Sequence, residues 1–367
     1  MAEYKTLVKK IPVSPDKKTK QKDYLKKGRL PIVDQGQSLV SGYTDDADMA
    51  VKCELPVIVF GDHTRAVKYI TFPFGAGADG IKVLQPKENI LPPFLYYGTQ
   101  YIVAKMPNRG YARHYQYVEK EDLPVPSLPE QERIVARIEE LFSQLDAGVE
   151  TLKKTKAQLA VYRQAVLKEA FEKVSARVLL GSISESRLGK MLDSEKNIGV
   201  PRRYLRNINV RWHSFDLSDL SEMPIEENEV GKYSLRKGDL VICEGGEPGR
   251  CAVWESDDVI FYQKALHRVR FTDSSNPKFY MYYLWYAAQT GQLKSLFTGT
   301  GIKHLTGQSL VKVLVPTAER ITQDSIVNEI ETHLSVCDSI EHTVDLALQQ
   351  AEAMRQSILK DAFEGRL

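Results

Sequence analysis

The chain has 367 residues with a formal net charge of +2, and 43% of its residues are hydrophobic. This length predicts two domains that each bury a core of their own. Its apolar runs are too short to cross a membrane, and the first residues lack the apolar stretch of a signal peptide. The four cysteines form no CxxC pair, which is typical of reduced thiols rather than of disulfides or zinc ligands. We therefore expect a soluble protein of the cytoplasm.

Residues 1–127 are predicted to form a first α/β domain. Short strand-like runs, separated by glycine and proline, lie at 55–60, 66–72 and 80–84. Lysines crowd the first thirty residues, among them Lys17, Lys18 and Lys20. A basic patch on a nearly neutral chain suits a polyanionic partner that is touched at defined places. A solvated charged surface explains such a patch equally well.

Residues 128–173 are predicted to form a long helix that follows a proline-rich connector. Apolar residues recur at every seventh position, namely Ile138, Leu145, Leu152, Leu159 and Val166. This heptad repeat is typical of a coiled coil. A second line of apolar contacts is expected along the same helix, with Tyr162 among its members.

Residues 174–314 repeat the α/β pattern and are predicted to form a second domain. Strand-like runs lie at 239–244, 250–254 and 266–271. A second basic cluster contains no acidic residue and consists of Arg202, Arg203, Arg206 and Arg211. The order of features corresponds loosely to that of the first half, since Arg113-His114 and Lys303-His304 both precede a Val-Pro pair by the same interval.

Residues 315–367 are predicted to form a second copy of the long helix. The segment RQAVLKEAFE at 163–172 returns as RQSILKDAFE at 355–364, and no insertion interrupts the repeat. The apolar positions of this copy include Ile330, Val344, Ala351 and Ile358, with Ile340 and Met354 beside them. A gap-free repeat predicts two copies of one rigid element, because loops tolerate changes in length and packed helices do not.

The two helices are expected to pack on each other as an antiparallel coiled coil. At a rise of 1.5 Å per residue, a helix of about 40 residues spans about 60 Å, so the pair would hold the two domains a fixed distance apart. The alternative is that each helix only covers its own domain. The expected fold is therefore mixed α+β, with two α/β domains separated by two long helices.

Motifs for catalysis or for a cofactor are weak. The glycines at 75–80 satisfy GxGxxG, but a strand-like run follows where a dinucleotide site needs a helix. The loop at 245–250 lacks the lysine and the hydroxyl residue of a phosphate-binding loop, and the seven histidines form no HxxxH or HExxH pair. We expect no catalytic residue and no metal site, and a binding module fits better than an enzyme.

Five segments resemble the specificity subunit of type I restriction–modification systems. The run LPEQERIV at 128–135 and the terminal RQSILKDAFEGRL at 355–367 are similar to the central and distal repeats of that family. The runs at 203–209, 235–241 and 248–250 are similar to the body of its target recognition domains. The resemblance covers essentially the whole chain, and its helical motifs are the more specific part.

The resemblance implies a DNA-binding protein without catalytic activity. Each α/β domain would read one arm of a split, asymmetric target in double-stranded DNA, and the helices would set the spacer between the arms. Two methyltransferase subunits would dock on the helices and methylate adenine N6 with S-adenosylmethionine, and a separate restriction subunit would use ATP and Mg to cut DNA. This chain itself would bind no cofactor. The rival interpretation is a coiled-coil scaffold whose halves bind proteins.

The lysines near the N-terminus suit DNA phosphates, and other basic residues in polar loops could reach phosphates or base edges. These are Arg65, Arg113, His114, Arg202, Arg203, Arg206, Arg211, Arg250, Lys303 and His304. Salt bridges within the chain, or exposure to solvent, are the alternative for any one of them. The set as a whole is predicted to form the DNA interface.

Overall fold

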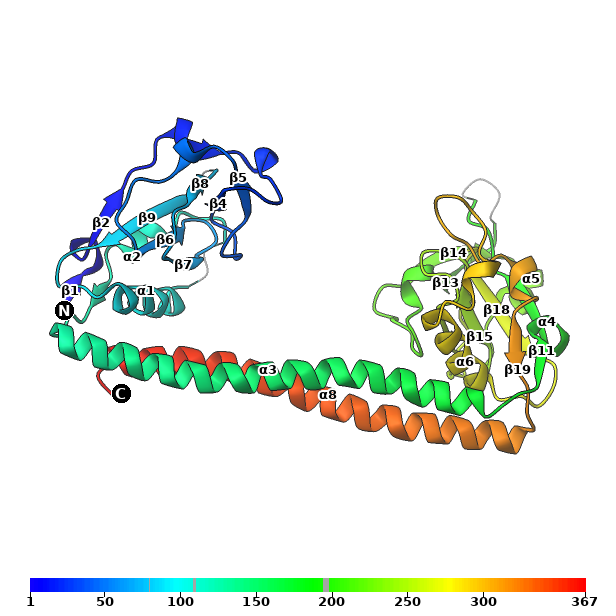
Figure 1. The fold of residues 1–367 in the computed structure, drawn as a ribbon. Helices are drawn as coiled ribbons and strands as arrows, with labels where there is room; N and C mark the ends of the chain where they lie inside the picture. Colours follow the sequence, from blue (N-terminus) through cyan, green and yellow to red (C-terminus); the bar gives the residue numbers. More distant parts are fainter. Residues whose placement is uncertain (79, 108–109, 194–197) are drawn as a thin grey trace. The chain divides into compact units, whose positions relative to one another are not determined.

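The computed structural model describes residues 1–78, 80–107, 110–193 and 198–367. These residues form two compact units, and each unit contains one globular domain with half of each long helix (Figure 1). Unit 1 comprises Met1–Lys153 and Val344–Leu367, and unit 2 comprises Lys154–Thr343. The boundary between the units cuts each long helix in two. The sequence analysis instead predicted that each helix is separate from the domains. None of the helices in the described residues is long and apolar enough to cross a membrane.

The domain of unit 1 is built from two small sheets, a short strand pair and two α-helices. The first sheet is antiparallel, in the order β2 (Val8–Ile11), β9 (Ile81–Pro86), β6 (Val57–Gly61) and β7 (Val67–Ile70). The second has the order β3 (Lys18–Thr19), β8 (Gly75–Gly77), β4 (Leu30–Val33) and β5 (Gly42–Thr44), with β8 parallel to both of its neighbours. The domain also contains β1 (Ala2–Glu3) paired with β10 (Asp122–Leu123), and the α-helices α1 (Pro92–Lys105) and α2 (Tyr115–Val118).

The domain of unit 2 repeats this design. Its first sheet has the order β12 (Ser184–Leu188), β18 (Leu266–Phe271), β15 (Leu240–Cys243) and β16 (Cys251–Val253). Its second has the order β14 (Ser221–Ile225), β13 (Val200–Leu205) and β17 (Phe261–Tyr262), with β13 parallel to β17. The remaining elements are β11 (Arg177–Leu179) paired with β19 (Leu314–Pro316), and the helices α4 (Leu180–Ile183), α5 (Glu227–Tyr233), α6 (Pro277–Gln289) and α7 (Gly307–Leu310).

Both main sheets share one topology, so their strands can be matched one to one. The order β2-β9-β6-β7 in unit 1 corresponds to β12-β18-β15-β16 in unit 2, and β5-β4-β8 corresponds to β14-β13-β17. The parallel pairs β4–β8 and β13–β17 are also matched. The prediction of two related α/β domains is therefore confirmed.

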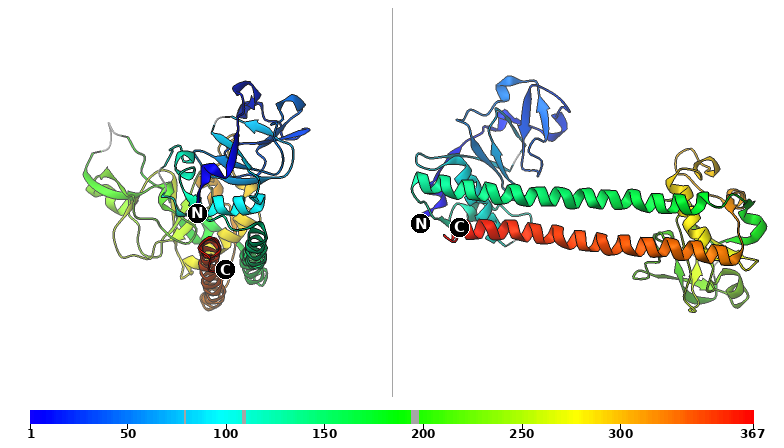
Figure 2. Two further views of the ribbon diagram at one scale, coloured as in Figure 1. Left: turned by 90° about the vertical axis from the view of Figure 1, so that its left-hand side faces the viewer. Right: turned by 60° about the horizontal axis from the view of Figure 1, so that its bottom comes forward.

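The long helices are α3 (Leu128–Glu172) and α8 (Arg320–Phe363). In unit 2 the ammonium of Lys156 lies 3.4 Å from the Glu341 carboxylate, and that of Lys173 lies 3.5 Å from Glu329. As the chain advances along α3, its partners on α8 therefore run backwards, which defines an antiparallel pair (Figures 1 and 2).

The halves of α3 and α8 in unit 1 are antiparallel as well. The guanidinium of Arg133 donates to the carbonyl of Leu367 at 3.0 Å, and the Arg355 guanidinium lies over the Phe142 ring at 4.3 Å. The predicted antiparallel pairing is confirmed in each unit.

The residues predicted for the helix-pair interface lie on the inner stripe of the helices. Six are buried, namely Ile138, Leu159, Val166, Ile330, Val344 and Ala351, and three are half-buried, namely Leu145, Leu152 and Ile358. The second apolar line is different, because Tyr162, Ile340 and Met354 are exposed. Two helices bury only a narrow stripe between them, so the expectation that Ile340 and Met354 pack in the interface is wrong. Tyr162 still contacts α8, because its hydroxyl lies 2.9 Å from the Nδ1 atom of His333.

Matched residues of the sequence repeat hold each domain on the helices. In unit 1 the ring of Phe363 on α8 packs on Phe94 of α1, with 5.0 Å between the ring centroids. In unit 2 the ring of Phe171 on α3 packs on Phe279 of α6, with 5.4 Å between the centroids. The last turn of one long helix therefore carries the phenylalanine that enters the core of each domain.

A buried glutamine near the start of the other long helix completes each attachment. In unit 1 the Gln131 side chain accepts a hydrogen bond from the backbone N–H of Leu91, just before α1, at 2.8 Å. In unit 2 the Gln323 side chain accepts one from the backbone N–H of Asn276, just before α6, at 2.7 Å. The sequence repeat therefore preserves contacts to the domains as well as contacts between the helices.

Candidate nucleic-acid interface

In unit 2 three loops meet at one end of the main sheet. The first follows β13 at Arg206-Asn207, the second is the hairpin Glu244–Arg250 between β15 and β16, and the third is the turn Thr298–His304. The Asn207 side chain donates to the carbonyl of Gly245 at 2.6 Å, and the backbone N–H of Leu305 donates to Glu244 at 2.7 Å. The loops therefore form one connected surface.

Several predicted contact residues lie on this surface. Arg250 donates to the backbone carbonyl of Asn207 at 3.0 Å and pairs with Glu247 at 3.0 Å. Lys303 is exposed and donates to the carbonyl of Gly299 at 2.7 Å, while His304 is half-buried. Arg250 is thus largely a structural residue of the hairpin, whereas Lys303 presents its charge to solvent.

Close packing fixes the hairpin against the third loop. A Cβ atom added at Gly245 would lie 3.0 Å from the Nδ1 atom of His304, closer than ordinary van der Waals contact. Trp212 also binds the hairpin, because its indole N–H donates a hydrogen bond to the Glu247 carboxylate at 2.7 Å. The sequence analysis did not select Glu247, and no local motif distinguishes it from other surface acids.

The arginine cluster carries acidic partners. Arg202 pairs with Glu227 at 3.2 Å, Arg206 with Asp219 at 2.6 Å and Arg211 with Asp216 at 3.4 Å. The acids lie in the segment that follows the cluster in the chain. The antiparallel pairing of β13 with β14 helps to bring this segment back beside the arginines. The cluster is therefore less positive than its local sequence predicts, and only Arg203 lacks an ion pair within the described part of the chain.

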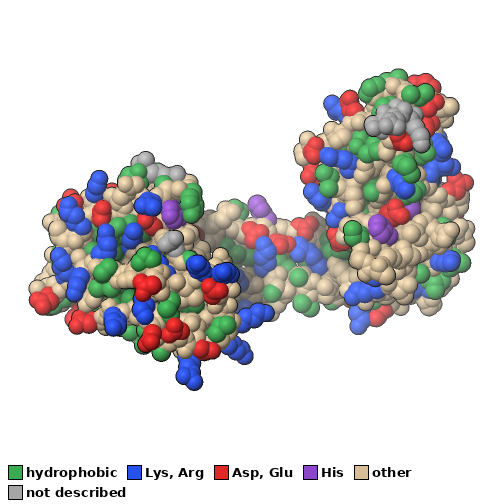
Figure 3. All heavy atoms as spheres, turned by 90° about the horizontal axis from the view of Figure 1, so that it is seen from above, with side chains coloured by type: hydrophobic (Ala, Val, Ile, Leu, Met, Phe, Trp, Pro, Cys, Tyr) green, Lys and Arg blue, Asp and Glu red, His purple; other side chains and the backbone are tan. Residues whose placement is uncertain are grey.

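These pairs are mostly exposed, so each stabilises the fold by no more than about 1 kcal/mol. DNA phosphates could replace the carboxylates at small cost. Figure 3 shows the same mixture on a wider scale, because Lys and Arg are interspersed with Asp and Glu over the visible face of each unit.

In unit 1 the matched loops also converge. The Thr64 hydroxyl, in the hairpin between β6 and β7, donates to the carbonyl of Gln35 after β4. In the same hairpin the His63 ring donates a hydrogen bond from Nδ1 to the carbonyl of Ala112 at 3.2 Å. Arg65 donates to the carbonyl of Met106 at 3.3 Å, so part of its donor capacity is already used.

An aromatic pair extends from these loops into solvent. The rings of His63 and Tyr111 are stacked, with centroids 4.3 Å apart and planes within 5° of parallel. Tyr111 is 84% exposed, and exposed aromatic rings are common in nucleic-acid-binding surfaces. The sequence analysis missed this pair, because the two residues are distant in the chain.

His114 is not on the surface. It is completely buried, and its Nδ1 atom lies 3.0 Å from the carbonyl of Asp62. The Asp62 carboxylate in turn accepts a hydrogen bond from the backbone N–H of Tyr115 at 2.8 Å. His114 is therefore a core residue that fixes the turn, and its selection as a DNA contact is corrected. Its neighbour Arg113 is exposed.

The three N-terminal lysines also differ in their exposure to solvent. Lys17 and Lys20 are exposed, and Lys18 is half-buried in β3. All three belong to unit 1. The exposed members retain the charge that the interpretation as phosphate contacts requires.

Sites for cofactors or metals find no support in the described residues. They contain no group of three His, Cys, Asp or Glu side chains that could hold a metal ion. The GxGxxG segment leads from β8 into β9 and not into a helix, as expected. Burial raises the pKa of the Cys243 thiol to about 11, so this cysteine is not an activated nucleophile.

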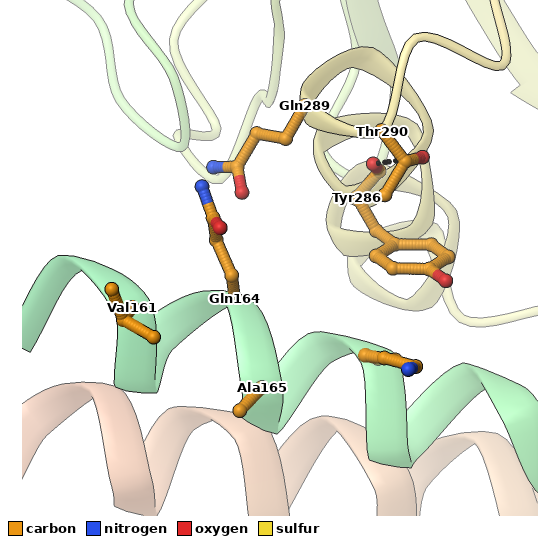
Figure 4. A pocket seen from close by; sticks show the side chains of 7 residues that line it. Val161, Gln164, Ala165, Tyr286, Gln289 and Thr290 are labelled. Carbon is orange, nitrogen blue, oxygen red and sulfur yellow. Dashed lines mark hydrogen bonds between the residues drawn. The ribbon is translucent and has the colours of Figure 1, made fainter.

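The tyrosine-rich helix α6 is part of a core. Tyr280, Tyr282 and Tyr283 are buried. A small hollow does lie between α6 and α3, lined by Tyr286, Gln289 and Thr290 on one side and by Val161, Gln164, Ala165 and Lys168 on the other (Figure 4). The aromatic residues are thus explained mainly by packing, which removes the main support for a protein-binding scaffold.

Comparisons with known proteins agree with this architecture. Residues 10–160 match the family model of the type I restriction modification DNA specificity domain. The specificity subunit of the type I restriction enzyme EcoKI from Escherichia coli (strain K12) is 25% identical over 273 residues, and that of StySPI from Salmonella potsdam is 29% identical over 272. Each alignment covers 67% of this chain and 58% of the relative, so the chain matches little more than half the length of these relatives.

Solved structures share the fold over the whole chain. A chain from a study of complex assembly in the type I R-M system gives a TM-score of 0.75 at 17% identity, covering 100% of this chain and 97% of that one. The HsdS subunit from Thermoanaerobacter tengcongensis gives a TM-score of 0.57 at 18% identity, covering 100% and 96%. Residues 10–160 are therefore similar to type I restriction modification DNA specificity domains, and the two solved structures share the fold of this chain.

Proposed function

We propose that this chain is the specificity subunit of a type I restriction–modification complex. Each domain would read one arm of a bipartite, asymmetric sequence in double-stranded DNA, and the paired helices would set the spacer between the arms. The observation that carries the proposal is one scaffold present twice with different loops. Matched main sheets and matched attachments accompany loops as different as His63–Tyr111 and Trp212–Glu247.

Two different reading domains in one chain suit a target that is not a palindrome. A symmetric dimer presents the same surface twice and reads inverted repeats. Here the loops that converge in unit 1 differ in residue type from those in unit 2, so each arm would have its own sequence. The chain would act in the cytoplasm, because the proposed partner is DNA.

The catalytic steps would belong to partner subunits. Two methyltransferase subunits would dock on the repeated helices and bind S-adenosylmethionine, and restriction subunits would bind ATP and Mg. The repeated copies of the helix, which are most alike at 163–172 and 355–364, offer two related surfaces, and this is the support for two methyltransferases per chain. The chain itself would be non-enzymatic and would carry no cofactor.

Mapping N6-methyladenine tests the proposal directly. Cells that express the chain together with its methyltransferase should carry the modification in a two-part motif with a fixed gap. Lys303→Ala should weaken or relax recognition of one arm and leave the other unchanged. Lys312→Ala is the matched control, because it removes an exposed lysine of the same unit that belongs neither to the three loops nor to the long helices. A genome without any two-part motif would contradict the proposal.

Salt dependence tests the arginine cluster separately. Each phosphate contact contributes about 0.9 to the slope of log K against log salt for duplex DNA. Arg203→Ala should therefore weaken binding to every duplex sequence and flatten this slope by about one unit. Unchanged binding at several salt concentrations would mean that the cluster is not at the DNA.

A further inference from the structure

An arginine inside the domain of unit 2 is buried, and its Nε atom has no hydrogen-bond partner among the described residues. Arg268 on β18 is only 4% exposed. It pairs in register with Val241 on β15 and with Arg187, an exposed residue, on β12. Side chains alternate along a strand, so Arg268 faces the same side as Leu266, which packs with Tyr262 in one core cluster.

The carboxylate of Asp239 already binds another arginine, Arg270. Arg270 binds both carboxylate oxygens of Asp239, at 2.7 and 2.6 Å. Within the described residues, the buried Nε atom of Arg268 and the buried hydroxyl of Tyr262 have no hydrogen-bond partner. Burial raises the pKa of Tyr262 to about 12, and the nearby charges of Arg268 and Arg187 oppose this rise.

Such an arrangement is unfavourable without a ligand. Like charges directly opposite each other on paired strands destabilise a sheet, and Arg187 faces Arg268 in this way. A buried cation whose donors are not all hydrogen-bonded destabilises the folded state. Burial accordingly lowers the pKa of the Arg268 guanidinium.

The fold itself does not require these polar residues. The matched strands of unit 1 have Ile11 opposite Val83, in the places of Arg187 and Arg268, and Ala76 in the place of Tyr262. These three residues belong to an apolar core cluster. The same scaffold is therefore filled by hydrophobic side chains in one domain and by two arginines and a tyrosine in the other.

We propose that Arg187, Arg268 and Tyr262 form a binding site for a phosphate group. Guanidinium groups present paired N–H donors that match phosphate oxygens, and a phenol hydroxyl adds one more donor. A bound phosphate would neutralise the cross-strand repulsion and satisfy the buried donors. The phosphate belongs either to the DNA backbone or to free phosphate, and only the first source rests on the proposed function.

Thermal unfolding of the full chain tests the site without DNA. Inorganic phosphate is compared with chloride at equal ionic strength and pH. The wild type should be stabilised by phosphate, with a rise in Tm that saturates, because a ligand that binds only the folded state stabilises it. Arg268→Val, which installs the residue of unit 1, should lose this rise and keep an equal or higher Tm in chloride.

Three further variants keep the result interpretable. Tyr262→Phe should reduce the phosphate-dependent rise while preserving the ring, and Lys312→Val, which removes an exposed cation of the same unit, should leave the rise unchanged. Arg187→Leu carries the same test if Arg268→Val does not fold, because Arg187 lies at the exposed edge of the cluster. An equal rise in the wild type, Arg268→Val and Arg187→Leu would overturn the proposal, as would no rise in the wild type together with an unchanged DNA slope.

DNA binding then identifies the source of the phosphate. If a backbone phosphate occupies the site, Arg268→Val should reduce the slope of log K against log salt by about 0.9, and inorganic phosphate should compete with the DNA. If free phosphate is the ligand, the thermal effect should be lost in the variant while the slope stays unchanged. Should the chain not bind DNA at all, the proposed function fails and the thermal experiment still decides whether the site exists.

Discussion

Replacing Gln131 with leucine tests how the domain of unit 1 is held on its helix. Gln131 is fully buried and accepts from the backbone N–H of Leu91 at 2.8 Å. It also donates to the carbonyls of Asn89 and Pro126, both at 3.0 Å. Leucine has a similar size but forms none of these bonds. At about 1 kcal/mol per net hydrogen bond, with a further penalty for a buried N–H without a partner, we expect a loss of roughly 2–4 kcal/mol.

Chemical denaturation followed by circular dichroism measures the stability loss, and hydrogen exchange locates it. The amide of Leu91 should exchange much faster in Gln131→Leu, because its hydrogen bond is lost. Gln144→Leu changes an exposed glutamine of the same helix and should stay within about 0.5 kcal/mol of the wild type. If Gln131→Leu also stays within that range and the Leu91 amide remains protected, the buried glutamine does not hold the domain and the reasoning is refuted.

Three more predictions address the helices and their surroundings. Ile330→Ala should cost about 2–5 kcal/mol because Ile330 is fully buried, whereas Ile340→Ala, at an exposed position, should change stability by less than about 0.5 kcal/mol in the same denaturation assay. The ion pair between Asp146 and Arg355 is partly exposed, so a double-mutant cycle should give a coupling of about 0.2–1 kcal/mol that shrinks in high salt. Burial lowers the pKa of His213 from 6.5 to about 4. As the pH falls, this imidazole therefore takes up a proton in the unfolded chain before it does so in the folded chain. Stability should fall by roughly 2–3 kcal/mol between about pH 6.5 and pH 4, and His213→Phe should remove that part of the acid loss.

The long helices were the most predictable part of the fold. The first was expected at 128–173 and spans Leu128–Glu172. The second was expected from 315, but α8 begins at Arg320 because Leu314–Pro316 forms strand β19, which pairs with β11. Heptad spacing is a local signal and survives in the sequence. A three-residue strand depends on a partner more than a hundred residues away, so no local pattern marks it.

The candidate interface was predicted less well, because charge in the sequence is not charge on the surface. Arg202, Arg206 and Arg211 are neutralised by acids that the fold brings back to them. His114 looked like a partner of Arg113 in a polar turn, yet its ring is buried against Asp62. In both cases tertiary contacts decide which side chains remain available, and a single sequence does not contain those contacts.

The two domains differ in a way that separates attachment from recognition. The residues that join each domain to the helices are matched, as Gln131 with Gln323 and Phe363 with Phe171 show. The inner face of the main sheet is not matched, since Val83 is replaced by Arg268. Changes on that face leave the attachment untouched, so the binding properties of one domain can change without altering how it sits on the helices. A domain that carried Arg268→Val should therefore retain the protection of the Asn276 amide by Gln323, even where its phosphate binding is lost.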